Sequence, residues 1–430
     1  MAMRAGRGLD VLSLGSFVVL GLPDGMLGTA WPSMRQSFGA PIADLGLVLL
    51  VITIGSVAVS VVVGALIRRF GVPALLAASG ACAALGGTGF ALAPGMGLVF
   101  AVAVLLGAAA GMMDGGLNTA VGLSGRPRLL NLLHAAYGVG TTVGPLLVTV
   151  AIVISSWRPA YAALVVLDLV IAASWLAQRR AERARAGAPP PAAARQAPGP
   201  PAPGGPAPDA PAPGGPTAGT GHPGDAWSRR RSTFVIAVGM AIFFLYTGVE
   251  VAAGQWEASF CRGNLGLSAA AAGIATFGFW GALTGARIMW ALLPRPVRPS
   301  RIVGWGSAVA VLATAVIWWQ PGVPVTLASF VLLGAALAGV FPALIAMTPG
   351  RIGRGRAQHV IAWQVGAAAA GGSGLSALIG LLIGLAGLPV LGPSLTVLAI
   401  LLAGGTVALE RVAPIPAPLG PPVSPVRPSP

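Results

Sequence analysis

The chain has no lysine, few acidic residues and only two cysteines. Only 9% of its 430 residues are charged, and all 26 basic residues are arginine. Soluble domains carry roughly 25% charged residues, so a water-soluble fold is excluded. Cys82 lies in an apolar run and Cys261 in an expected outer loop, without the spacing of a disulfide framework or a metal site. We expect two free thiols and no bound metal.

Several catalytic motifs are also missing. The chain contains no G-x-x-x-x-G-K-[ST] loop, no H-E-x-x-H pair and no nucleophile elbow. We therefore expect neither an enzyme nor an ATP-driven pump, and no cofactor. The formal charge of +15 is typical of nucleic-acid binding, but the arginines are spread over separate loops and form no continuous basic face. No nucleic-acid partner is expected.

Long apolar runs make up most of the chain, in which 55% of residues are hydrophobic and the mean hydropathy is +0.83. Runs of about 20 residues are long enough to cross a bilayer, and in lipid only a helix satisfies its own backbone over such a run. The sequence predicts an all-α polytopic membrane protein of twelve spans. These spans are expected at 11–31, 45–67, 72–92, 97–121, 129–154, 159–177, 233–256, 267–292, 301–319, 323–347, 357–385 and 388–408.

The arginines orient these spans. Loops on the opposite side carry only Arg35, Arg158 and Arg262. Because positively charged loops stay in the cytoplasm, we expect both termini there and the chain in the plasma membrane, the inner membrane of a bacterial cell. The arginines on the terminal side include Arg4, Arg7, Arg68, Arg69, Arg126, Arg128, Arg179, Arg180, Arg295, Arg298, Arg351, Arg354 and Arg411.

A change of composition divides the chain into two halves. Residues 179–232 are rich in proline, alanine and glycine and contain PAPGGP twice, so we expect a disordered cytoplasmic linker. It separates a six-helix half at 1–178 from a second at 233–411. A disordered proline-rich tail is expected at 412–430.

The two halves resemble each other. VLLGAA occurs at 104–109 and, 227 residues later, at 331–336. Near that offset an acid followed by a tryptophan also recurs, Asp24 with Trp31 and Glu250 with Trp256. Internal duplication in a polytopic protein is typical of transporters whose site lies between the repeats. We expect two pseudo-symmetric six-helix bundles.

A wider pattern extends this reading over nearly the whole chain outside the linker and tails. It comprises Gly21, Asp24, Gly25, Trp31 and Pro32, Asn131 to His134 with Gly138, Gly140, Gly144 and Pro145, Gly248, Glu250, Gly254 and Trp256, Trp280, Gly285 and Arg287, and Phe341, Pro342, Thr348 and Pro349. The pattern resembles the major facilitator superfamily, and within it the fucose-permease-like sugar transporters. Two positions depart from it: Ile67 stands where an aspartate is usual in the gating loop, and Asp114 where a glutamate is familiar.

Acids inside spans are the first candidate site residues, since a charge at a helix centre costs about 2.5–3.5 kcal/mol on insertion scales. Asp24 and Asp114 lie on the first and fourth spans, which the resemblance makes cavity-lining, and we assign them to proton coupling. The alternative is a structural hydrogen bond between helices. Asp168, in the sixth span, receives no role.

Polar and aromatic side chains near these acids are candidate solute contacts. Carboxylates and amides accept hydrogen bonds from hydroxyls, and an indole face packs on the C–H groups of a sugar ring. For the tryptophans near span ends the alternative is the interfacial aromatic belt. The candidates are Asn118, Glu250, Gln255, Trp256, Trp31, Trp280 and Gln364.

A further set has expected gating or structural roles. Arg68 and Arg69 belong to the gating-loop motif, and for Arg287 we expect snorkelling or capping of a neighbouring helix. Glycines in the fifth span permit close helix packing and movement between the halves. The set is completed by Gly138, Gly140 and Pro145.

These features predict a monomeric secondary transporter in the bilayer that moves a small polar solute, a sugar, with a proton as coupling ion. A drug or metabolite exporter on the same fold is an alternative that the apolar Met112 and Met113 would suit. A non-transporting membrane sensor is a second, which the absence of a recognisable signalling domain disfavours.

The arginine distribution yields a topology prediction. In a variant without native cysteines, single cysteines in the 179–232 linker should be shielded from an impermeant thiol reagent in intact cells. Cysteines near Gly95 or Val323 should react with it. Labelling of the linker from outside would reverse the orientation.

Overall fold

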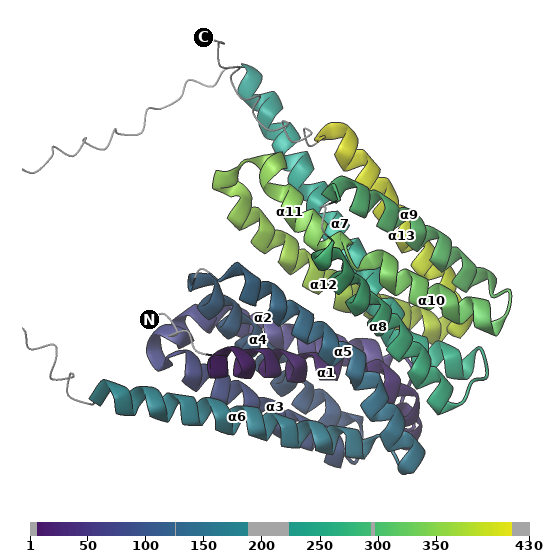
Figure 1. Ribbon diagram of the computed structural model, residues 1–430. Helices are drawn as coiled ribbons and strands as arrows, with labels where there is room; N and C mark the ends of the chain where they lie inside the picture. The colour runs from purple at the N-terminus through teal and green to yellow at the C-terminus, as the bar shows by residue number, and fades with distance from the viewer. Residues whose placement is uncertain (1–6, 125, 188–222, 294–296, 415–430) are drawn as a thin grey trace, which may run out of the picture.

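The computed structural model describes residues 7–124, 126–187, 223–293 and 297–414, and over these residues the chain is all-helical (Figure 1). Twelve helical segments are long and apolar enough to cross a membrane, which confirms the predicted fold class. The first half contains α1 (Arg7–Phe38), α2 (Asp44–Phe70), α3 (Val72–Leu92), α4 (Met96–Leu123), α5 (Pro127–Ile154) and α6 (Arg158–Gly187).

The second half contains α7 (Pro223–Gly263), α8 (Ala269–Leu292), α9 (Pro299–Trp319), α10 (Val323–Leu337), α11 (Val340–Ile352), α12 (Arg354–Ala386), a short 3-10 helix η2 (Leu388–Val390) and α13 (Leu391–Val412). Since α6 continues to Gly187 and α7 begins at Pro223, both ends of the expected 179–232 linker are helical. Residues 188–222 and 415–430 of the expected linker and tail lie outside the described residues.

One expected span is interrupted. The run predicted at 323–347 forms α10 and α11, with a turn at Ala338 and Gly339 between them. Pro342 explains the break, because it has no N–H to donate to the carbonyl of Ala338 and its ring would crowd that carbonyl. The turn leaves a backbone acceptor free at mid-span.

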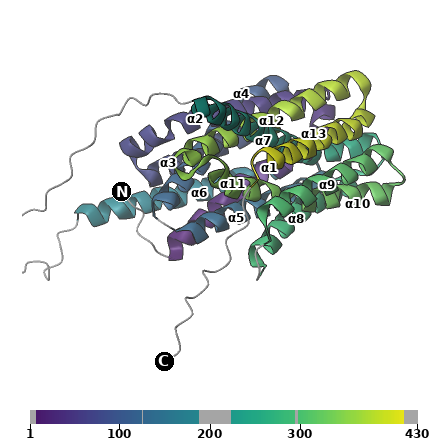
Figure 2. The ribbon, with the colours of Figure 1, turned by 90° about the horizontal axis from the view of Figure 1, so that it is seen from above.

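Helix pairing repeats between the halves. In the first half α1 packs on α5, α2 on α4 and α3 on α6; in the second α7 packs on α12, α8 on α10 and α9 on α13. Counting α10 and α11 as one span, these are the same pairs six spans later. Figures 1 and 2 show two bundles, the first half purple to blue-teal and the second teal-green to yellow. The repeat in sequence is therefore a repeat in packing.

Glycines allow α1 and α5 to touch backbone to backbone. A Cβ on Gly21 or Gly25 would lie within 3.0 Å of the α5 backbone, and one on Gly140 or Gly144 within 3.0 Å of the α1 backbone. The ring of Pro145 packs at Gly25. Gly140 and Pro145 thus hold the first half together, whereas Gly138 lies against Thr284 of α8 in the other half.

The halves meet on the side opposite to the chain termini, called the far side here. Nη1 of Arg262 donates to Oγ of Ser33 (2.9 Å), and Gly46 on α2 packs closely against Ala377 on α12. α5 also packs on α8, and α1 on α7. Toward the terminal side, where the two termini lie, the bundles diverge (Figure 1).

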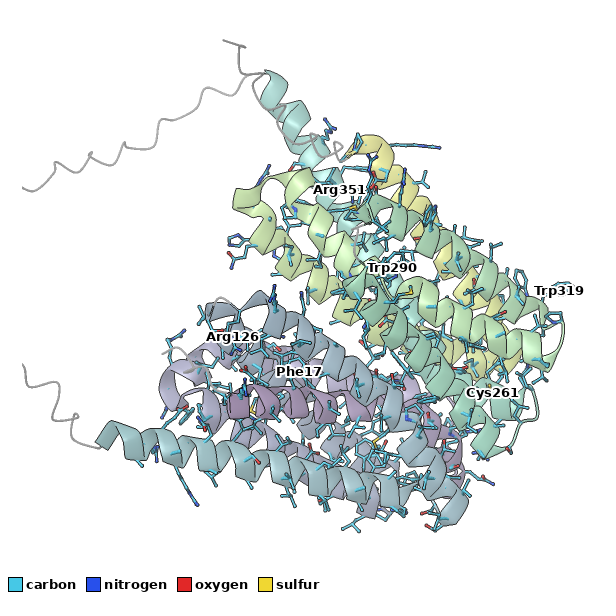
Figure 3. The ribbon with its side chains drawn as sticks, viewed as in Figure 1. Phe17, Arg126, Cys261, Trp290, Trp319 and Arg351 are labelled. Atoms are coloured by element: carbon cyan, nitrogen blue, oxygen red, sulfur yellow. The ribbon has the colours of Figure 1, made fainter. Side chains whose placement is uncertain are left out.

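On the terminal side, each half contains an ion pair between two of its own segments. Arg126, before α5, pairs with Asp10 of α1 (2.5 Å), and this bond raises the pKa of the Arg126 guanidinium. Arg351 of α11 pairs with Glu410 of α13. Figure 3 labels both arginines, one in each bundle. Such bonds allow each half to move as a unit.

Both cysteines are free thiols, as expected. The expectation of an outer loop for Cys261 is wrong: it lies in the last turns of α7 and is fully buried. It packs with Ala258, Ala272 and Ala275, which form a small apolar cluster. α7 is longer than the predicted span, which ended at residue 256, because the apolar pattern continues through this cluster.

The α1–α5 contact generates a stability prediction. Gly140→Ala should destabilise the protein by about 1–3 kcal/mol, the usual cost of overpacking, because its Cβ would meet the carbonyl of Val18. Gly15→Ala on α1, where a Cβ meets nothing within 4 Å, is the matched control. Thermal unfolding in detergent should show a lower midpoint for Gly140→Ala alone; equal midpoints would contradict the close approach.

Candidate functional site

A cavity of about 450 Å³ lies between the two halves, within the size range of small-molecule sites. Helices of both halves line it, and it faces the terminal side, where Asp114 is exposed. Its polar lining includes Asp24, Thr53, Ser56, Asp114, Tyr137, Thr141, Thr247, Glu250, Gln255, Trp280, Arg287 and Ser373. Two of its walls are therefore acidic, one in each half.

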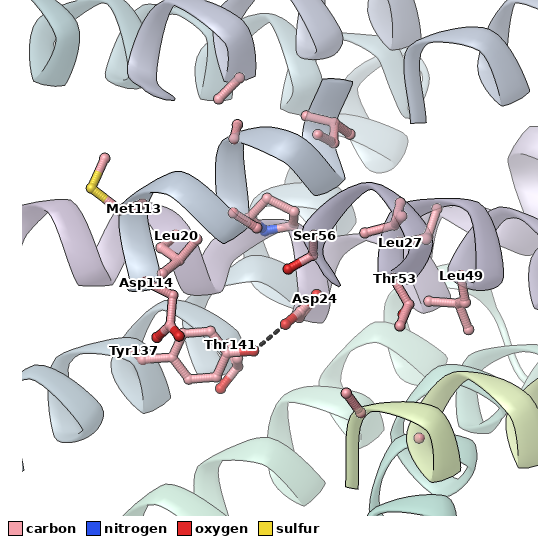
Figure 4. Close-up of a pocket in the computed structure, with 18 of the residues that line it drawn as sticks. Leu20, Asp24, Leu27, Leu49, Thr53, Ser56, Met113, Asp114, Tyr137 and Thr141 are labelled. Carbon is pink, nitrogen blue, oxygen red and sulfur yellow. Dashed lines mark hydrogen bonds between the residues drawn. The ribbon is translucent and has the colours of Figure 1, made fainter. Parts of the chain in front are cut away.

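Asp24 is held by a tyrosine from the neighbouring helix. The close approach of α1 and α5 places the Tyr137 hydroxyl against the Asp24 carboxylate, to which it donates a hydrogen bond (Figure 4). Among the described residues Asp24 forms no ion pair. A neutral hydroxyl supports either protonation state of a carboxyl group.

Asp114 lies on α4, on the terminal side of the cavity. Nδ2 of Asn118, one turn further along, donates to its carboxylate (2.8 Å), which confirms the shared face that their spacing predicts. Asn118 itself lies outside the cavity lining. His134 of α5 interacts electrostatically with Asp114 and Arg287. Asp114 is thus exposed at the place where the halves diverge.

Glu250 is paired with an arginine. Nη2 of Arg287 donates to both its carboxylate oxygens (3.2 and 3.1 Å), and the Tyr246 hydroxyl donates to the same group. Nε of Arg287 donates to the free carbonyl of Ala338 at the α10–α11 break (3.2 Å). The expected capping of a neighbouring helix is present, but the side chain faces the cavity and does not snorkel.

Gln255 and Trp280 form the far-side end of the cavity. Nε2 of Gln255 donates to the backbone carbonyl of Asp24 (2.7 Å), which ties α7 to α1. Oε1 of Gln255 and Nε1 of Trp280 are both buried without a hydrogen-bond partner. Both residues line the cavity, and a hydroxyl group is of the kind that could satisfy either atom, since it can donate and accept.

Besides Asn118, three further candidate contacts lie outside the cavity lining. Trp31 is fully buried and its indole N–H donates to the carbonyl of Ile42 (3.1 Å), while Trp256 donates to the carbonyl of Ser376 (3.0 Å). Gln364 accepts from Thr348 (2.9 Å) near the start of α12. The two indoles face neither lipid nor cavity, because they pack between helices.

The gating-loop arginines lie at the terminal end of α2. Arg68 and Arg69 are both exposed, and the Arg69 guanidinium lies over the Phe70 ring (5.3 Å). Neither lines the cavity. They are placed where α2 ends, at the surface between the second and third spans.

The tyrosines are the functional groups that sequence reasoning missed. The chain contains only three, Tyr137, Tyr161 and Tyr246. Two of them donate to the cavity carboxylates, and Tyr137 and Tyr161 line the cavity. Their rarity, combined with positions deep inside apolar spans, was the available signal.

The chain belongs to the Major Facilitator Superfamily, which it matches over residues 13–375. It is therefore a multi-pass membrane transporter and not an enzyme. No curated protein sequence matches the chain.

Solved structures share this fold at low sequence identity. A D-xylose–proton symporter superposes with a TM-score of 0.71 at 13% identity, covering 95% of this chain and 98% of the other. The nucleoside transporter NupG gives 0.67 at 14% (93% and 99%), and the transporter FucP in its outward conformation 0.57 at 15% (93% and 98%). These similarities establish the architecture.

The Arg287 pair yields a prediction. Arg287→Met leaves Glu250 and the Ala338 carbonyl without their partner, and should lower stability by about 2–3 kcal/mol. A fully buried ion pair would cost more to break, but the Arg287 side chain is 28% exposed. Thermal unfolding measures the loss. Adding Glu250→Gln should recover much of it, and a double variant as unstable as Arg287→Met would show that the ion pair is not the cause.

Proposed function

We propose that the protein is a secondary active transporter that moves a small polar solute, a sugar, by alternating access and couples it to a proton. It would belong to the fucose-permease-like branch. The observation that carries the proposal is a cavity between two repeated halves whose first-half carboxyl groups, Asp24 and Asp114, have no arginine partner in the described structure.

Coupling follows from the cost of closing the cavity over a charge. A neutral carboxylic acid is much cheaper to hold in a dehydrated site than a carboxylate. Protonation of Asp24 would favour closure, and deprotonation would favour opening and release. Glu250 differs, because Arg287 already balances its charge. The proton is therefore assigned to the first half, with Asp114 sharing the work.

The unsatisfied groups of the cavity support a hydroxyl-rich solute. The free oxygen of Gln255 and the free N–H of Trp280 match a hydroxyl, which both donates and accepts. The Trp280 ring offers an apolar face for sugar C–H groups. One of the superposed structures is, by its name, a D-xylose–proton symporter.

Alternating access follows from where the halves touch. Contacts across the interface gather at the far side, so the structure corresponds to the state open to the terminal side. The arginine bias assigns the terminal side to the cytoplasm and the protein to the plasma membrane. Because helices of one chain complete the cavity, a monomer is sufficient.

An exporter of drugs or metabolites is the second candidate. Met113 and several aliphatic side chains line the cavity and would suit an apolar molecule. A sensor without transport is less favoured. Uptake of labelled sugars into proteoliposomes, with and without a pH gradient, separates the three functions, since only a sugar symporter accumulates sugar when the gradient is applied.

The coupling proposal predicts a specific defect. Asp24→Asn imitates the protonated acid and should still exchange solute in counterflow. It should lose accumulation driven by a pH gradient, because no proton can leave the site. Both assays use the same proteoliposomes, so counterflow is the control for folding. Gradient-driven accumulation equal to wild type would make Asp24 structural.

Asp114→Asn tests the second acid. It should lose gradient-driven accumulation too, with counterflow retained if Asp114 only carries a proton and lost if it also contacts the solute. Full accumulation in this variant would assign coupling to Asp24 alone.

A further inference from the structure

The cavity has a branch that enters the first half. Besides the helices that face the second half, its lining includes side chains of α3 and α6, which lie on the side of the first bundle remote from the second (Figure 1). Small residues line this path, among them Ala83 on α3 and Ala109 and Ala110 on α4, and Gly80 allows α3 to pack directly on α6 beside Asp168. We call the space bounded by Ser79, Gly80, Ala83, Tyr161, Asp168 and Ile171 the α6 branch.

Two polar groups in the α6 branch have no partner. Asp168 is 6% exposed and its Oδ2 makes no hydrogen bond, and the hydroxyl of Tyr161, which is 1% exposed, makes none either. The two residues are seven apart on α6, so they share one helix face. Buried polar groups are rarely left unsatisfied in this way unless something else binds them.

No protein cation reaches Asp168. In the described structure it forms no ion pair, and Arg158, at the start of the same helix, donates instead to the carbonyls of Ala91 and Ala93 (2.7 and 2.8 Å). Ser79, beside the branch, donates to the carbonyl of Ala109 (2.7 Å). The neighbours are thus committed elsewhere, and Asp168 is free to bind a donor that comes from outside.

The remaining walls define the chemistry of that donor. The Tyr161 ring stacks on Phe90 (centroids 5.1 Å apart), and Leu106, Met113 and Ile171 provide aliphatic surface toward the main cavity. A cation beside a carboxylate and aromatic rings is stabilised by both, and hydrocarbon suits the aliphatic walls.

We propose that the α6 branch is a second binding subsite, which takes the protonated amine of an amphipathic molecule. Asp168 provides the counter-charge, and the aliphatic walls receive the attached hydrocarbon. The subsite is separate from the solute contacts at Gln255 and Trp280, so it does not depend on whether the main cavity carries a sugar.

The test compares two probes of equal size, n-butylamine and n-butanol, at pH 7, where the amine is protonated. Thermal unfolding of the purified full chain in detergent is followed at increasing probe concentration. The amine should stabilise wild type at a concentration about tenfold lower than the alcohol, the preference expected for one charge-assisted contact. Equal effects of the two probes would overturn the proposal.

Three variants assign the preference to the branch. Asp168→Asn should abolish it, whereas Asp44→Asn, which removes a carboxylate at the start of α2 outside the cavity lining, should keep it. Ala83→Leu leaves Asp168 in place and should also abolish the preference by filling the branch, so the test holds even if Asp168→Asn folds poorly. A preference that survives Ala83→Leu, or that Asp24→Asn removes instead, would place the amine in the main cavity and contradict the proposal.

Discussion

A carboxyl group in the central cavity is costly to hold unless hydrogen-bond donors compensate it, and three of the four there, all but Asp168, have such donors in the protein. The protein meets this constraint with hydrogen-bond donors taken from neighbouring turns and helices. Tyr137 serves Asp24, Asn118 serves Asp114, and Tyr246 with Arg287 serves Glu250. The glycine contacts between α1 and α5 follow from the same constraint, since only backbone-to-backbone packing brings the Tyr137 hydroxyl to Asp24.

The two halves share the same helix packing but differ in the charged groups around their cavity acids. At corresponding places on α1 and α7, an acid accepts a tyrosine hydroxyl. In the second half Arg287 also donates to this acid, Glu250, and to the carbonyl of Ala338 at the α10–α11 break. These bonds connect α7, α8 and the end of α10. In the first half no cation does so. The acid of the second half is therefore paired with an arginine, whereas Asp24 of the first half is bound by a neutral hydroxyl.

The sequence was sufficient for features that depend on composition and period. Apolar runs located the twelve spans, and the repeated acid–tryptophan pairs located the two halves. It was insufficient where the role of a residue depends on the direction of its side chain. Trp31 and Trp256 lie near span ends but pack between helices. The Arg287 side chain turns inward and pairs with Glu250. Pro342 is the sequence signal for the break after Leu337. The apolar run is continuous across this proline, and hydropathy alone does not register the loss of one N–H donor.

Most hydrogen bonds between the halves join hydroxyl or amide groups to backbone carbonyls, and Arg262 is the one charged donor among the described residues. Thr284 donates to the carbonyl of Gly138 (2.9 Å), Thr142 to that of Trp280 (3.2 Å), and Gln255 to that of Asp24. Such neutral bonds exchange protein for water at a net cost of only about 1 kcal/mol each. Breaking these hydrogen bonds when the halves separate therefore costs little free energy for each bond. No ion pair among the described residues joins the two halves, so the halves can separate without leaving a buried charge unpaired.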